Sequence, residues 1–163
     1  MALSPGGQTL YVASGYFSGT DMLHALDANT LALRSASPSS MSYDSGLAYL
    51  AASKDGQCIY ATDFAQHCVQ LIDSSSLAIT SSIPVGQGPL GICRSDLLNA
   101  LFVCCFGDNS VCMIDLASMA VAGWYTGLTG PMTVVTGPDG VTAYAANAGS
   151  DEILVISPLN QPA

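Results

Sequence analysis

The chain has 163 residues, of which half are hydrophobic and only 9% are charged, and its formal net charge at pH 7 is −9. Such a chain can bury a globular core and is too apolar to be disordered. Its three basic residues argue against a nucleic-acid partner, because phosphate backbones are bound by clusters of Lys and Arg. No apolar run approaches the length of a membrane-spanning helix, so we expect no membrane insertion.

Short apolar segments recur along the chain at a nearly constant spacing. An aromatic residue within a segment recurs after 49, 42 and 42 positions, an aliphatic residue before a turn after 46, 42 and 42, and a glycine after 42 and 42. These landmarks are Tyr11, Tyr60, Phe102 and Tyr144; Leu26, Ile72, Ile114 and Ile156; and Gly46, Gly88 and Gly130. Three landmarks that recur at the same interval predict a structural repeat.

The predicted elements are short strands separated by turn residues. The first unit is expected to begin on an inner strand at 2–3, and extra residues lengthen its loops. In the second unit, strands are expected at 58–62, 68–73 and 78–84, and the next unit opens with a strand at 90–94. Asp, Ser and Gly clusters lie between them, which is typical of tight turns. The last unit ends after a strand at 153–157, which gives roughly fourteen strands in all.

A period near 42 residues with four strands per unit predicts an all-β fold, a β-propeller of four-stranded antiparallel blades. The whole chain, 1–163, is then a single partial propeller domain with repeats at about 1–46, 47–88, 89–130 and 131–163. No strand is left to return to the first blade, so the ring is expected to be incomplete. Three explanations stay open: a piece of a longer gene product, two half-rings that assemble, or an open or rearranged form.

The repeat also carries a recognisable pattern. The segment at 4–13 reads S-P-G-G-Q-T-L-Y-V-A, and V-Q-L-I-D at 69–73 and V-G-Q-G-P at 85–89 follow in the second unit. This pattern resembles the YVTN-type β-propeller repeat of YncE-like propellers, over nearly the whole chain. The resemblance implies a ring of about seven blades in complete members. It is unspecific for function, because such propellers occur in binding proteins, surface proteins and some enzymes.

The sequence contains no catalytic signature, and we expect no metal or cofactor. The six cysteines lack the C-x-x-C spacing of zinc and redox sites and are expected to be buried free thiols. His24 and His67 fall at different repeat positions and do not predict a shared metal site. The repeated carboxylates Asp27, Asp73 and Asp115 follow strands, where Asp commonly accepts backbone hydrogen bonds within a turn.

We expect a ligand to bind at the mouth of the central channel, where the loops before the inner strands converge. Asp44, Gln87 and Thr129 occupy equivalent repeat positions in these loops and are the predicted polar rim. Tyr16 and Phe17, in the long loop of the first unit, are predicted to add an aromatic contact. The neighbours Tyr43 and Ser45 lie in the same rim segment as Asp44.

These features predict a non-catalytic binding or scaffolding domain for a protein, peptide or small molecule. One alternative is a propeller enzyme of lactonase or lyase type, which the resemblance brings in and whose active site would need further blades. Another is a spacer in a surface protein. The partner could be a second copy of the chain or the remaining blades of a longer one. The chain contains no visible signal peptide and its thiols suit a cytoplasmic or anaerobic setting, whereas the resembled family is often exported, so the compartment stays open.

Overall fold

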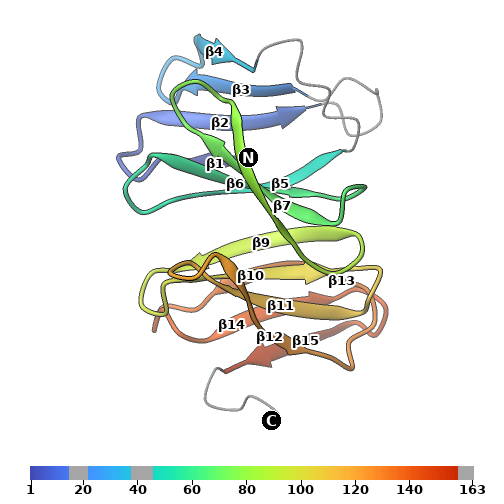
Figure 1. Ribbon diagram of the computed structural model, residues 1–163. Helices are drawn as coiled ribbons and strands as arrows, with labels where there is room; N and C mark the ends of the chain where they lie inside the picture. The colour runs from blue at the N-terminus through green and yellow to red at the C-terminus, as the bar shows by residue number, and fades with distance from the viewer. Residues whose placement is uncertain (15–21, 38–45, 158–163) are drawn as a thin grey trace.

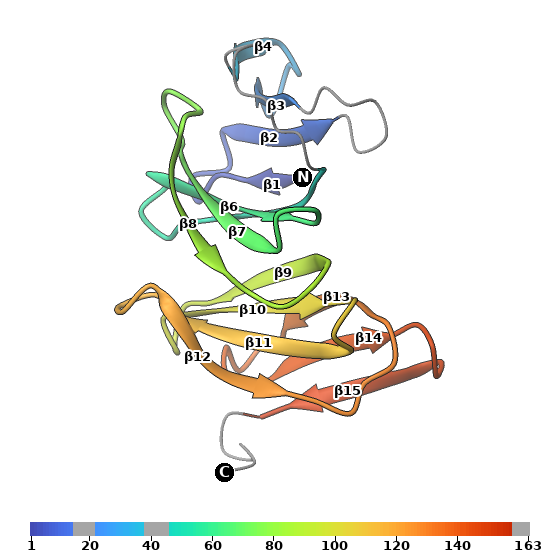
Figure 2. The ribbon, with the colours of Figure 1, turned by 45° about the vertical axis from the view of Figure 1, so that its right-hand side comes forward.

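The computed structural model of the chain describes residues 1–14, 22–37 and 46–157. These residues form fifteen strands and no helix, arranged in four antiparallel sheets that follow one another along the molecule (Figures 1 and 2). The first sheet (blue) lies at one end and the fourth (orange to red) at the other. The count is one more than the roughly fourteen strands expected, and the expected inner strand Ala2–Leu3 is present and pairs with β2.

Each sheet takes its strands in chain order from the innermost to the outermost. The first sheet contains β1 (Ala2–Leu3), β2 (Thr9–Ser14), β3 (Met22–Asp27) and β4 (Leu33–Ala36). The second contains β5 (Leu47–Ala52), β6 (Cys58–Asp63), β7 (Cys68–Asp73) and β8 (Ile79–Pro84). The third contains β9 (Pro89–Ser95), β10 (Ala100–Cys105), β11 (Ser110–Asp115) and β12 (Ala120–Tyr125). The fourth has three strands, β13 (Pro131–Thr136), β14 (Ala143–Asn147) and β15 (Glu152–Ile156).

The predicted fold class is confirmed: the chain is an incomplete β-propeller built from antiparallel blades. The four strands expected between 58 and 94 are β6 to β9, with ends that agree within one residue. The order β13-β14-β15 includes no strand from the N-terminal segment, so the described sheets do not close a ring.

Three apolar layers fill the spaces between successive sheets. Tyr11 and Leu23 of the first sheet pack with Ile59 and Ile72 of the second. The next layer joins the second and third sheets, and the last joins the third and fourth. The neighbours Cys104 and Cys105 illustrate the alternation of a strand, because Cys105 faces the second sheet and Cys104 faces the fourth. A strand between two layers is therefore apolar on both sides, and every residue of β10 is buried.

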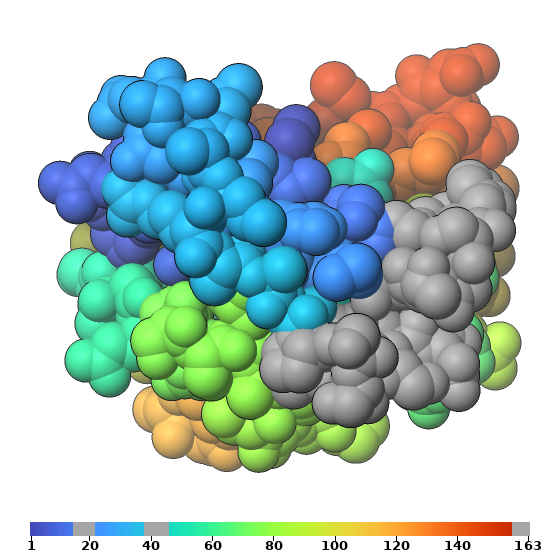
Figure 3. Space-filling model, turned by 90° about the horizontal axis from the view of Figure 1, so that it is seen from above, coloured from blue at the N-terminus to red at the C-terminus, as the bar shows by residue number. Residues whose placement is uncertain are grey.

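The outer faces of the first and last sheets have no neighbouring sheet among the described residues. On the first sheet, a row of paired leucines crosses this face: Leu3 opposite Leu10, Leu10 opposite Leu26, and Leu26 opposite Leu33. Leu3 and Leu33 are exposed, and Leu10 and Leu26 are half-buried. In Figure 3, which views the molecule from this end, the first sheet (blue to cyan) lies nearest the viewer.

The outer face of the fourth sheet is also apolar. Val135 is paired with Tyr144, and Tyr144 with Val155, while Ile153 lies two pairs from Val155 on β15 and therefore on the same face. All four side chains are exposed. We call Leu3, Leu10, Leu26 and Leu33 the open face of the first sheet, and Val135, Tyr144, Ile153 and Val155 the open face of the fourth sheet.

Candidate functional site

Gln87 and Thr129, two residues of the predicted rim, lie in equivalent loops between sheets. Gln87 lies between β8 and β9, and Thr129 lies between β12 and β13. The backbone N–H of Gln87 donates to Asp108 Oδ2 at 2.7 Å, and the N–H of Thr129 donates to Asn147 Oδ1 at 2.6 Å. These bonds tie each loop to the next hairpin of the following sheet, while both side chains remain exposed.

The other predicted rim residues cannot be compared in the same way. Asp44, with its neighbours Tyr43 and Ser45, lies outside the described residues, as do Tyr16 and Phe17. The rim therefore stays a prediction, in which Gln87 and Thr129 have matching positions and exposed side chains.

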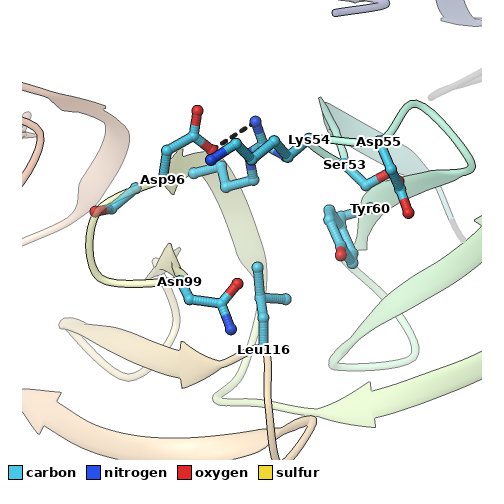
Figure 4. Close-up of a pocket in the computed structure, with 9 residues that line it drawn as sticks. Ser53, Lys54, Asp55, Tyr60, Asp96, Asn99 and Leu116 are labelled. Atoms are coloured by element: carbon cyan, nitrogen blue, oxygen red, sulfur yellow. Dashed lines mark hydrogen bonds and ion pairs between the residues drawn. The ribbon is translucent and has the colours of Figure 1, made fainter.

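A cavity of about 310 Å³ lies at the opposite ends of the strands, between the second and third sheets (Figure 4). It is formed mainly by the loop between β5 and β6 and the turn between β9 and β10, whereas the rim lies at the start of β9. Its lining residues are Ser53, Lys54, Asp55, Tyr60, Arg94, Ser95, Asp96, Asn99 and Leu116. Figure 4 shows Asp96 and Asn99 on one side of the cavity and Ser53, Asp55 and Tyr60 on the other.

Two of the three basic residues of the chain line this cavity, Lys54 and Arg94. The side chain of Arg94 is 16% exposed, and its guanidinium forms an ion pair with Asp96, from NH2 to Oδ1 at 2.6 Å. Lys54 is exposed and has no ion pair within the described part of the chain. The pKa of Asp55 is lowered first by a hydrogen bond from the Ser53 hydroxyl, then by the N–H of Gln57, and to the smallest extent by the positive charge of Arg94.

Tyr60 and Leu116 give the cavity an apolar part. Tyr60 is almost fully buried, and this burial raises the pKa of its phenol, so the hydroxyl stays protonated at neutral pH. No hydrogen bond from the Tyr60 hydroxyl is found among the described residues. The cavity thus combines two cations and two carboxylates with a neutral hydroxyl and apolar surface, a mixture that suits recognition of a small molecule.

The aspartates that the sequence predicts to stabilise turns have this structural role in the fold. Asp27, Asp73 and Asp115 each accept backbone N–H bonds from the residues two and three positions later, as predicted. The exposed His67 accepts the N–H of Gly88 through Nδ1 at 3.1 Å, and His24 lies on β3 in another sheet. Among the described residues, no group of three or more His, Cys, Asp or Glu side chains is placed to hold a metal ion.

The six cysteines are free thiols, as predicted, but only four of them are buried, since Cys58 and Cys93 are half-buried. Burial raises the pKa of Cys93 and of Cys104 to about 12 and that of Cys68 to about 11, which keeps these thiols protonated and poorly nucleophilic. The Sγ atoms of Cys105 and Cys112 lie 4.0 Å apart. These residues are diagonal neighbours on β10 and β11, a placement that does not favour a disulfide.

Comparison with known proteins supports the fold and identifies no family. No family model matches the chain, and no curated protein matches it. Among solved structures 883 chains match. One is the hydrazine synthase of Kuenenia stuttgartiensis, which is 24% identical to this chain and superposes with a TM-score of 0.75. The match covers 96% of this chain and 48% of that one, so the chain spans about half the length of its structural neighbour. At this identity the likeness extends to the fold alone.

None of the described segments forms a helix with the length and apolar character needed to span a membrane.

Sequence reasoning missed the cavity between the second and third sheets. It looked for polar residues at equivalent positions of successive repeats, whereas Lys54 and Arg94 occupy non-equivalent positions. A usable signal was present, because residues 54 and 94 are separated by nearly one repeat. Two basic residues with that spacing lie on adjacent blades, where their side chains can meet at the same end of the strands.

Proposed function

We propose that the chain is a non-catalytic binding and scaffolding propeller domain of the YVTN type, and that a second copy of the chain covers its open faces. The binding role rests on exposed loops and faces that a partner can reach, with the rim of Asp44, Gln87 and Thr129 as its candidate ligand contact. The observation that carries the proposal is the contrast between buried and exposed residues at equivalent positions of the third and fourth sheets.

Phe102 and Val111 of the third sheet are 0% exposed, because the fourth sheet packs on them. Their equivalents one repeat later, Tyr144 and Ile153, are 37% and 70% exposed. The fourth sheet therefore exposes to solvent a face that, in the third sheet, is covered by the next sheet. Contiguous exposed apolar surface of this kind marks interaction sites.

The open face of the first sheet has the complementary character. The residues that cover Phe102 and Val111 include Ala143, Ala145 and Ile156 of the fourth sheet. Leu10, Val12 and Leu26 occupy the equivalent positions in the first sheet, as judged from the spacing of the repeats. The first sheet of one copy thus offers the surface that the fourth sheet of another copy lacks, and two such contacts would join two half-rings in a closed pair.

Light scattering coupled to size exclusion, over a range of concentrations, tests this assembly. We expect a mass near twice the 16.7 kDa of the chain. Ile153→Asp should give a monomer, because it places a charge in the buried contact. Met119→Asp is the matched control, since Met119 is an exposed apolar residue in the turn between β11 and β12, away from both open faces.

A wild-type monomer at every concentration contradicts the pairing of two copies, and so does a mass that Ile153→Asp leaves unchanged. Species larger than a dimer, growing with concentration, would indicate open head-to-tail chains and also count against a closed pair. If a longer chain carrying further blades is monomeric while this chain aggregates, the open faces belong to blades of the same polypeptide and the second copy is excluded.

A further inference from the structure

The cavity between the second and third sheets brings together two of the three basic residues of an acidic chain, beside the carboxylates Asp55 and Asp96. Lys54 and Arg94 line it, although the chain has only three basic residues and a net charge of −9. The third basic residue, Arg34, lies in the first sheet and is paired with Asp27. The ammonium of Lys54 has no such carboxylate partner among the described residues, so this charge is available to a ligand.

Arg94 is suited to hold a carboxylate. Its guanidinium has five N–H donors in a planar fork that can bind two carboxylate oxygens side by side. Asp96 engages NH2, and no second acceptor for this guanidinium is found in the described part of the chain. Because the side chain is largely buried, water screens its charge less than it screens a surface arginine.

The rest of the cavity limits what the carboxylate can belong to. Tyr60 and Leu116 offer an aromatic ring and an aliphatic side chain as apolar surface. The volume of about 310 Å³ is at the small end of the range for small-molecule pockets, roughly 300 to 1,000 Å³. Asp55 and Asp96 bring the local charge of the lining back to about zero, which disfavours a ligand with several negative charges such as a polyphosphate.

We propose that this cavity binds a small monocarboxylate with an aromatic or apolar body, whose carboxylate contacts Lys54 and Arg94 while its body packs on Tyr60 and Leu116. The site lies at the opposite ends of the strands from the predicted rim and does not depend on assembly with a second copy. The proposal assigns a class of ligand to the cavity, in addition to the partner proposed for the open faces.

Titration with benzoate, followed by NMR of backbone amides, tests the proposal. We expect saturable shifts at residues that line the cavity, including Lys54, Tyr60 and Asn99. Benzamide has the same shape without the charge, and inorganic phosphate has charge without the apolar body, so both should bind roughly tenfold more weakly than benzoate or worse.

Lys54→Gln should weaken benzoate binding by roughly tenfold, the scale of one charge-assisted hydrogen bond. Arg34→Gln removes the same charge from the first sheet and is the matched control, for which we expect unchanged affinity. Arg94→Lys keeps the charge of Arg94 and loses its planar fork, so it too should weaken binding. If Arg94→Lys does not fold, the exposed residue Lys54 still carries the test.

Four results would overturn the site. Equal binding of benzamide and benzoate would show that the carboxylate is not recognised. Tighter binding of phosphate than of benzoate would indicate a general anion site. An equal loss of affinity in Lys54→Gln and Arg34→Gln would reduce the effect to the net charge of the chain, and shifts confined to other residues would move binding elsewhere.

Discussion

Asp73 accepts hydrogen bonds from the backbone N–H groups of Ser75 and Ser76 and from both of their hydroxyls. All four bonds favour the ionised carboxylate, and they lower its pKa to about 2, with the hydroxyl of Ser75 as the largest cause. The carboxylate thus closes the turn between β7 and β8, and the same arrangement recurs at Asp27 and Asp115. A carboxylate at equivalent positions of the first three sheets thus stabilises the turns of the chain.

Replacing Asp73 by Ala should lower the thermal midpoint by a few degrees at pH 7, because the turn loses its acceptor. The pKa is depressed on folding, so the stabilising effect of the ionised carboxylate is present above pH 4 and is lost as the pH falls toward 2. The difference between wild type and variant should therefore shrink between about pH 4 and pH 2. Melting curves by circular dichroism across this range provide the measurement.

Asp73→Asn is the control for this turn, since its side-chain oxygen can still accept the N–H groups. We expect a smaller loss at pH 7 than for Asp73→Ala. A difference between wild type and Asp73→Ala that stays constant from pH 7 to pH 2 would show that the carboxylate charge does not stabilise the turn.

At the scale of elements, β9 and β13 approach each other closely. These are the innermost strands of the third and fourth sheets, and Gly91 lies at their contact. A Cβ on Gly91 would lie 2.5 Å from Cα of Thr133 and 2.7 Å from the carbonyl oxygen of Met132. Both are backbone atoms, so a rotamer change cannot relieve the clash.

Gly91→Ala should destabilise the fold by about 1–3 kcal/mol, because the two strands must move apart to admit the methyl group. Gly6→Ala provides a matched control, since a Cβ on Gly6 meets nothing within 4 Å and its backbone is not in the left-handed region. Urea denaturation of both variants measures the effect. If Gly91→Ala unfolds at the same urea concentration as Gly6→Ala, the close approach of β9 and β13 is not a constraint on the sequence.

The elements were largely predictable from the sequence, and their contacts much less so. The spacing from Tyr60 to Phe102 to Tyr144 predicted the blade architecture, because the same strand position holds an aromatic residue in each blade. Gly91 gave no such signal, since its equivalents Tyr49 and Thr133 carry side chains and only the path of β13 makes glycine necessary. The cavity beside Arg94 was missed for the same reason: it depends on how two different repeat positions meet across neighbouring sheets.

At the scale of the whole molecule, burial is uneven from one end to the other. The second and third sheets are covered on both faces by apolar layers, whereas the first and fourth are covered on one. Every residue of β10 is buried, while three of the five residues in β15 are exposed. In repeat architectures each unit is stabilised mainly by its neighbours, so the end sheets should open more readily than the central ones.

Amide hydrogen exchange should therefore be slowest in β6, β7, β10 and β11 and faster in β2, β14 and β15. Pairing with a second copy adds a concentration dependence: raising the protein concentration should slow exchange in the first and fourth sheets together, with little change in β10, because the contact covers both open faces at once. Ile153→Asp should abolish this dependence and leave the central sheets as before. Exchange that is uniform across the four sheets would contradict the gradient of stability. A gradient that does not depend on protein concentration would agree with more stable central sheets but would contradict the pairing of two copies.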